Sequence, residues 1–226
     1  MLRRAMRWGA AAATAGVLLL GACAAPEFNY VKNSGQMTYF KVPHDWHAAD
    51  TKTLDDALSG TNPDSVAAQQ REQAWWSVLY DASAHPTAEH LVTGDETDEP
   101  VVYARVSPLT PEAQNEISLD SLRDLFLPVT DAARQQAAAT ATGGLPGFQL
   151  LRDQVLTPSS GLHGVRVTYE YEMDNSVLHT FDQIALVNSD SSKLYELIIR
   201  CSSRCYSDRS SELNDIATSF TVRSSS

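Results

Sequence analysis

Four strand-like segments joined by short turns occupy the last third of the chain, and they constrain the fold more than any other feature. In the second of them Val165, Val167 and Tyr169 alternate with polar residues, the period-two pattern of a half-buried antiparallel strand. The four segments are residues 149–156, 164–173, 177–188 and 193–201. Turns this short favour pairing of successive strands into an antiparallel meander.

Further strands and helices are predicted on both sides of this meander. Aromatic and β-branched residues predict strands at 37–42, 74–81 and 101–106. Helices are predicted from Asn62 to about Gln73, after Ser118, over 131–141 and over 208–219. Helices that precede and follow an antiparallel sheet indicate an α+β fold, with a central, mainly antiparallel sheet flanked by helices.

Two short motifs then suggest a family. The opening Phe40-Lys41-Val42-Pro43-His44-Asp45-Trp46 resembles the F-x-V-P-x-x-W start of PsbP/Mog1-like domains, and residues 216–222, IATSFTV, resemble their closing helix and S-F ending. The resemblance implies one α/β/α sandwich over residues 37–223. It also implies an accessory or binding role, because known members share no catalytic residues that could be transferred to this chain.

The head of the chain has the pattern of an export signal. Arg3, Arg4 and Arg7 precede the short apolar run 9–20, which is too short for a stable membrane span. The run ends in Leu20-Gly21-Ala22-Cys23, which resembles the lipobox of bacterial, actinobacterial-type lipoproteins. The resemblance implies that residues 1–22 are a signal peptide and that Cys23 becomes the lipid-bearing (palmitate-type) N-terminus of a tether over residues 23–36. The alternative is a secreted protein cleaved near Ala22 or Ala25.

The charge balance excludes some partners. The 226 residues contain 17 Lys and Arg against 28 Asp and Glu, a net charge of −11, and removal of residues 1–22 with their three arginines leaves −14. Because the basic residues are scattered along the sequence, a nucleic-acid partner is not expected. No polybasic run is present to hold an anionic membrane, so the lipid on Cys23 is expected to be the sole anchor.

Two cysteines remain once Cys23 is assigned to the lipid. Cys201 and Cys205 have C-x3-C spacing directly after a predicted strand, and an even pair in an exported chain predicts a structural disulfide. The alternatives are a redox pair or half of a metal site. Redox motifs of the thioredoxin kind use C-x-x-C, and no second Cys/His pair lies at zinc spacing.

One turn and one loop contain potential metal ligands. His44 and His47, with Asp45 or Asp50, have the donor atoms for a divalent metal, but the competing interpretation is favoured, in which Trp46 packs at the core edge and the histidines are loop residues. The run 94–99 holds four carboxylates without the ligand order of a calcium loop, so a solvated acidic loop is favoured.

The remaining motifs do not predict catalysis. Trp75 and Trp76 point to opposite sheet faces if they share a strand, and core packing is favoured over a ligand groove for both. The glycines of 143–147 follow a predicted helix, whereas a phosphate-binding loop precedes one. G-x-S-x-G and H-E-x-x-H are absent. No catalytic residue, metal site or cofactor is therefore predicted.

Together these patterns predict a binding or accessory protein, not an enzyme, on the outer face of the cell membrane. It would hold a protein partner or a small or lipidic ligand, whose binding residues the sequence does not identify. The alternatives are an envelope hydrolase with a non-contiguous active site and a passive structural lipoprotein.

Overall fold

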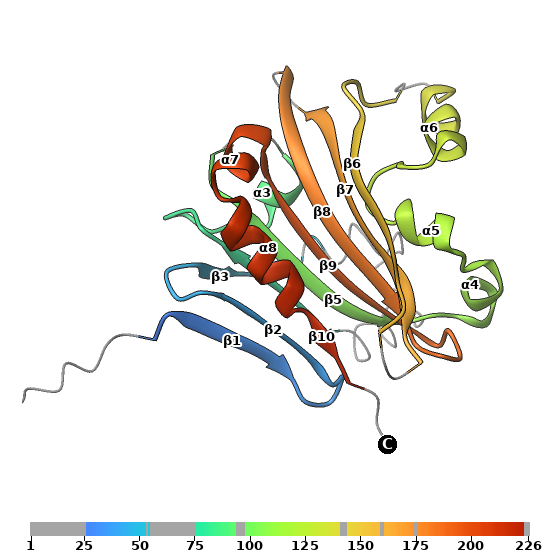
Figure 1. The fold of residues 1–226 in the computed structure, drawn as a ribbon, viewed down its shortest axis with the longest axis horizontal. Helices are drawn as coiled ribbons and strands as arrows, with labels where there is room; N and C mark the ends of the chain where they lie inside the picture. Colours follow the sequence, from blue (N-terminus) through green and yellow to red (C-terminus); the bar gives the residue numbers. More distant parts are fainter. Residues whose placement is uncertain are drawn as a thin grey trace, which may run out of the picture.

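The fold is built on two antiparallel sheets, a larger central one and a smaller one at its side (Figure 1). The computed structural model describes residues 26–52, 54, 76–93, 98–140, 144–158, 161–173 and 176–223. The larger sheet has the order β3-β4-β5-β9-β8-β7-β6. Its strands are β3 His47–Ala49, β4 Trp76–Asp81, β5 Val101–Pro108, β6 Gln149–Leu156, β7 His163–Met173, β8 Val177–Val187 and β9 Lys193–Ser202. The smaller sheet, β1-β2-β10, consists of Phe28–Asn33, Thr38–Pro43 and Thr221–Val222.

Helices cover both faces of the larger sheet (Figure 1). Helices α7 Ser203–Asp208 and α8 Ser210–Ser219 lie on one face, beside the smaller sheet. The other face is covered by four helices among the described residues: α3 Glu89–Val92, α4 Pro111–Glu116, α5 Leu119–Arg123 and α6 Asp131–Ala138. This arrangement confirms the predicted fold, a mainly antiparallel sheet between helical layers. No helix among the described residues is long and apolar enough to cross a membrane.

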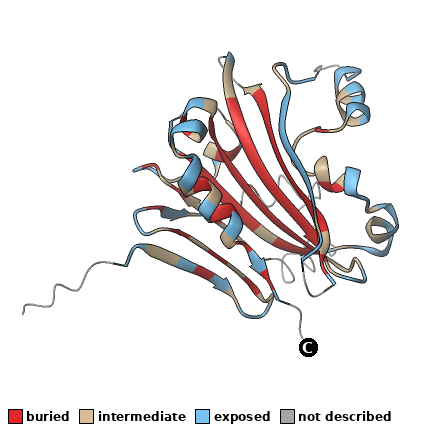
Figure 2. Ribbon diagram, in the orientation of Figure 1, coloured by how far each residue is buried: buried red, intermediate tan, exposed pale blue. Residues whose placement is uncertain are grey.

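The core is divided by the larger sheet, whose central strands are buried on both sides (Figure 2). On the α8 face, Ile199 of β9 packs with Leu213 and Ile216 of α8. On the opposite face the rings of Tyr169 and Phe181 stack with centroids 5.4 Å apart. The expectation of a half-buried strand over 164–173 is wrong, because helices cover β7 from both sides and bury its polar residues as well.

The smaller sheet corrects the predicted extent of the tether. Strand β1 lies within the segment 23–36, yet it pairs with β2 from Phe28↔Pro43 to Asn33↔Thr38. Val31 of β1 is buried in the core beside Phe40. Burial of that side chain and the pairing with β2 make β1 part of the domain, so the described fold begins at Phe28 and not at Met37.

The predicted disulfide is also corrected. Cys201 is the next-to-last residue of β9, Cys205 lies in α7, and both are buried free thiols. The hydrogen bond with Cys205 and burial raise the pKa of the Cys201 thiol. Cys201 is therefore held as a protonated thiol, and the two cysteines are unbridged.

Several predicted features lie outside the described residues. These are the signal segment, Cys23, the whole helix predicted at 62–73, Trp75, and residues 94–97 of the acidic loop.

Candidate functional site: a groove beside helix α8

A groove of about 570 Å³ lies between the C-terminal half of α8, strand β10 and the ends of β6, β7 and β8. Nine of its fourteen lining residues are apolar. Those that the core also uses are Leu162, Ile184, Leu186, Ala217, Phe220 and Val222. The groove therefore exposes the margin of the hydrophobic core along one side of α8.

The end of α8 fixes the position of one groove wall. The Ser219 hydroxyl donates to the Ile216 carbonyl at 2.7 Å and accepts the backbone N–H of Lys41 on β2 at 3.0 Å. The chain then enters β10, where Thr221 pairs with Tyr39 of β2. Helix and strand are thus tied to the smaller sheet, and the apolar side chains of this segment face the groove.

A buried charge network lies beneath the groove. Arg166 of β7, a lining residue, donates to Asp182 of β8 from Nε at 2.9 Å and from Nη2 at 2.6 Å. The same guanidinium reaches Asn214 of α8 at 3.2 Å, and the hydroxyl of Tyr206 donates to Asp182 at 2.7 Å. Four elements of the fold are joined through one ion pair.

The protonation states of this network are stable. Burial lowers the pKa of Arg166, but the hydrogen bond and charge of Asp182 raise it more. Burial, and then the charge of Asp182, raise the pKa of Tyr206. Arg166 is therefore a permanent cation and Tyr206 a neutral phenol, and their hydrogen bonds position α7 and α8.

The outer side of the groove is the free edge of the larger sheet. Strand β6 is the last strand of the sheet order, and seven of its eight residues are exposed. Leu150, Leu151 and Val155 expose 48%, 52% and 50% of their surface. An exposed edge strand with apolar side chains is a ready surface for association.

The residues considered for a metal site do not converge. His44 and His47 are exposed at the turn between β2 and β3. Trp46 between them is 2% exposed, which confirms its predicted packing at the core edge. Among the described residues no three His, Cys, Asp or Glu side chains are placed to hold a metal ion.

The described part of the acidic loop makes ion pairs with helices. Asp98 accepts from Arg204 at 2.7 Å, and Glu99 accepts from Arg209 at 3.2 Å. Trp76, from the predicted strand, is half-buried and packs on the core cluster of the α8 face, as expected for a core tryptophan.

Sequence reasoning missed Arg166, Asp182, Tyr206 and Asn214. The available signal was that these two charged residues, Arg166 and Asp182, lie inside long predicted strands. It was not used because only one face of each strand was expected to be buried. Their pairing across β7 and β8 depends on the register Arg166↔Ile184 and Thr168↔Asp182, which local patterns do not give.

Comparison with solved structures supports the fold. Cyanobacterial PsbP (CyanoP) from Synechocystis sp. PCC 6803 superposes with a TM-score of 0.51 at 12% identity, covering 90% of this chain and 96% of that one. LpqN, involved in cell envelope biogenesis of Mycobacterium tuberculosis, gives a TM-score of 0.43 at 18% identity over 81% and 82% of the two chains. The Saccharomyces cerevisiae Ran-binding protein Mog1p gives 0.42 at 11% identity over 86% and 95%.

The chain therefore has a PsbP/Mog1-like fold, an assignment that rests on the first of these structures. No protein-family model and no curated protein sequence matches the chain.

Proposed function

We propose that this chain is a lipid-anchored binding protein on the outer face of the cell membrane, and that it holds a segment of a protein partner in the groove beside α8. The groove carries the proposal, because the margin of the hydrophobic core lines it between a fixed helix and β6, the edge strand of the larger sheet among the described residues.

The anchoring half of the proposal is supported by the sequence. The basic head, the short apolar run and Leu20-Gly21-Ala22-Cys23 occur in the order of a lipoprotein signal. Lipidation of Cys23 would place the domain at the membrane surface. Labelling with palmitate tests this: wild-type protein is expected to take up label and the Cys23→Ala variant none. An unmodified Cys23 in the mature protein would contradict the anchor.

A protein segment fits the groove better than a small ligand. Small-molecule sites enclose most of the ligand surface, whereas here the wall formed by β6 is itself exposed along seven of its eight residues. An extended or helical segment of a partner would cover the groove and this edge together, burying apolar surface from both.

Site-specific cross-linking in cells tests the binding half. A photoreactive residue at Gln154, which lines the groove and shares the sheet face of Arg166, is expected to cross-link one protein species. The matched control is the same residue at Gln135, which is exposed on α6 on the other face of the sheet. Thr218→Asp, a charged substitution on the α8 wall, is expected to abolish the cross-link. Equal cross-linking from Gln154 and Gln135, or none from Gln154, would contradict a partner in the groove.

A further inference from the structure

The smaller sheet has an outer face of distinctive composition. In β1-β2-β10 the side chains of Val31, Phe40, Val42 and Val222 point inward and are buried. Residues directly opposite each other in the register share a face, so Tyr30 lies beside Lys41, and Lys32 lies beside Tyr39 and Thr221. The outer face thus gathers three aromatic and three basic residues: Phe28, Tyr30, Tyr39, Lys32, Lys41 and Arg223.

These residues form cation–π pairs across the sheet. The ammonium of Lys41 lies 3.9 Å from the ring centroid of Phe28, and the guanidinium of Arg223 lies 5.2 Å from that of Tyr39. No strand residue on this face is a carboxylate, although the chain as a whole has a net charge of −11. Tyr30 leaves 76% of its surface exposed. An amphipathic aromatic among Lys and Arg is typical of side chains at a membrane–water interface.

The position of Cys23 relative to this face limits how far the face can lie from a bilayer. Since β1 begins at Phe28, five residues of chain lead from Cys23 to the first strand. Fully extended, they span at most about 18 Å. A lipid on Cys23 would therefore hold β1 close to the membrane surface.

We propose that the outer face of β1-β2-β10 lies against a bilayer that contains anionic phospholipids, with Tyr30 at the level of the headgroups and Lys32 and Arg223 against their phosphates. This inference rests on the proposed lipid anchor and adds an orientation to it. The lipid supplies the attachment, and the sheet face determines which side of the domain meets the membrane.

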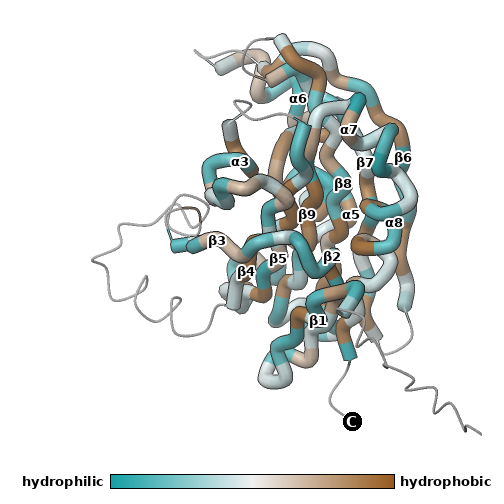
Figure 3. Tube along the Cα trace, turned by 90° about the vertical axis from the view of Figure 1, so that its left-hand side faces the viewer, coloured by the Kyte–Doolittle hydropathy of each residue, from teal (hydrophilic) through white to brown (hydrophobic). Residues whose placement is uncertain are grey.

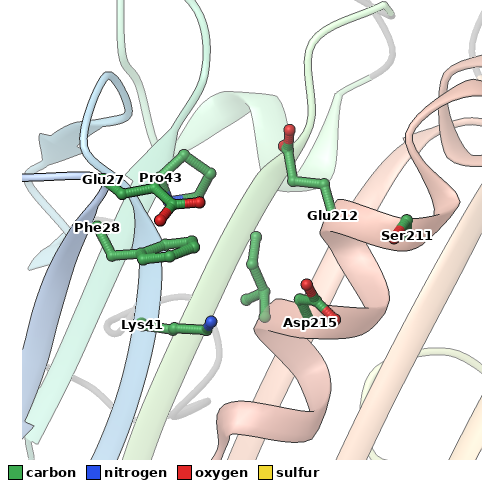
Figure 4. A pocket seen from close by; sticks show the side chains of 8 residues that line it. Glu27, Phe28, Lys41, Pro43, Ser211, Glu212 and Asp215 are labelled. Atoms are coloured by element: carbon green, nitrogen blue, oxygen red, sulfur yellow. The ribbon is translucent and has the colours of Figure 1, made fainter.

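Among the residues that the structure describes, carboxylates line a groove at one end of this face. Glu27, Glu212 and Asp215 line a groove of about 420 Å³ with Phe28 and Lys41, and Figure 4 shows Lys41 pointing across it toward α8. The hairpin end is different, because neither Lys32 nor Arg223 forms an ion pair with any residue that the structure describes. In Figure 3 this sheet lies at the border of the molecule, with β1 outermost. The uncompensated positive charge therefore lies at the hairpin end.

The test uses the full lipidated protein inserted into vesicles through its acyl chains. Vesicles of phosphatidylcholine alone are compared with vesicles that also contain phosphatidylglycerol, and hydroxyl-radical oxidation of Tyr30 is measured by mass spectrometry. We expect oxidation of Tyr30 to fall several-fold on the anionic vesicles at low salt and to recover at high salt, because salt screens the contacts with phosphate. Oxidation of Leu150 and Leu151, on the distant edge strand, is expected to stay constant.

Charge reversal identifies the face. The double variant Lys32→Glu with Arg223→Glu is expected to lose the protection of Tyr30. The matched control is Lys52→Glu with Arg204→Glu, the same change of net charge at exposed positions outside this sheet, which is expected to keep it. If the protein does not co-float with the vesicles in a density gradient, both the lipid anchor and this orientation are overturned. A chain that floats while Tyr30 is oxidised equally on both vesicle types overturns the orientation alone.

Discussion

The guanidinium of Arg166 lies beneath the groove with two nitrogens donating to the two carboxylate oxygens of Asp182, at 2.9 Å and 2.6 Å. Both side chains are almost completely buried. The pair connects adjacent strands, and through Tyr206 and Asn214 it holds α7 and α8 against the sheet. The position of the groove wall therefore depends on one buried ion pair.

Removal of one partner of this pair is expected to be costly. Asp182→Ala leaves a buried guanidinium without its counter-charge and should lower the free energy of unfolding by about 3–5 kcal/mol. Urea unfolding measures the change. Asp131→Ala, which removes an exposed carboxylate that pairs with Arg134 on α6, is the control and should change stability by less than about 1 kcal/mol. Equal losses in the two variants would show that the Arg166–Asp182 pair is not important for stability.

The double substitution Arg166→Met with Asp182→Leu separates charge loss from packing. Replacement of both charges by apolar side chains is often neutral or stabilising, so this variant should regain most of the loss seen in Asp182→Ala. A double variant as unstable as the single one would contradict this.

The contact between β7 and β8 requires glycine at position 164. A Cβ built there would overlap the backbone carbonyl of Ala185, which cannot move without breaking the ladder. Gly164→Ala should therefore cost about 1–3 kcal/mol or more through overpacking. Gly144→Ala is the control, because its nearest neighbours would lie 3.5 Å away. Thermal unfolding of both variants checks the prediction, and similar midpoints would contradict it.

His179 is expected to make stability depend on pH. Burial, followed by the positive charge of Arg200, lowers the pKa of His179 to about 4. In the unfolded chain this histidine has a pKa of about 6.5 and binds a proton below that pH, whereas in the folded chain it stays neutral down to about pH 4. The free energy of unfolding therefore falls as the pH drops from about 6.5 to 4, by roughly 3 kcal/mol in all.

Urea unfolding across this pH window measures the effect. His179→Leu should flatten the slope relative to wild type. His47→Leu, at an exposed position, should leave it unchanged. A wild-type slope in the His179→Leu variant would assign the pH dependence to other groups.

The free thiols lead to a direct chemical prediction. Cys201 and Cys205 are buried, and their hydrogen bond and burial raise the pKa of Cys201, so the reactive thiolate is scarce. Native protein should react negligibly with a thiol reagent, and denatured protein should react with two equivalents of the reagent per chain. No reaction after denaturation would indicate a disulfide, and a third equivalent would indicate an unmodified Cys23.

The four-strand meander was predictable because each strand contains its own signal. The segments predicted at 149–156, 164–173, 177–188 and 193–201 correspond to β6, β7, β8 and β9 within one residue at each end. The predicted helix 208–219 corresponds to α8, which begins two residues later because α7 occupies 203–208. Periodicity and turn residues act over a few neighbours, so they specify such elements without tertiary information.

The groove and its network were not predictable in this way. The buried polar residues of β7 and β8 are of the same residue types as exposed ones elsewhere in the sequence. Only the packing of helices on both faces of the sheet buries them. The segment 28–33 likewise resembles a polar tether until Val31 is seen in the core. These features depend on contacts between residues far apart in the sequence.

The amino-acid sequence by itself therefore determined the antiparallel meander and the α+β class, and it predicts a lipoprotein-type head with Cys23, since each depends on short-range patterns. The tertiary structure decided that β1 belongs to the domain, that Cys201 and Cys205 are unbridged, and that a groove opens beside α8. It also brought Lys32, Lys41 and Arg223, scattered in the sequence, onto one sheet face. The physical reason is that strand pairing and burial place side chains according to register and face, which act across the whole chain.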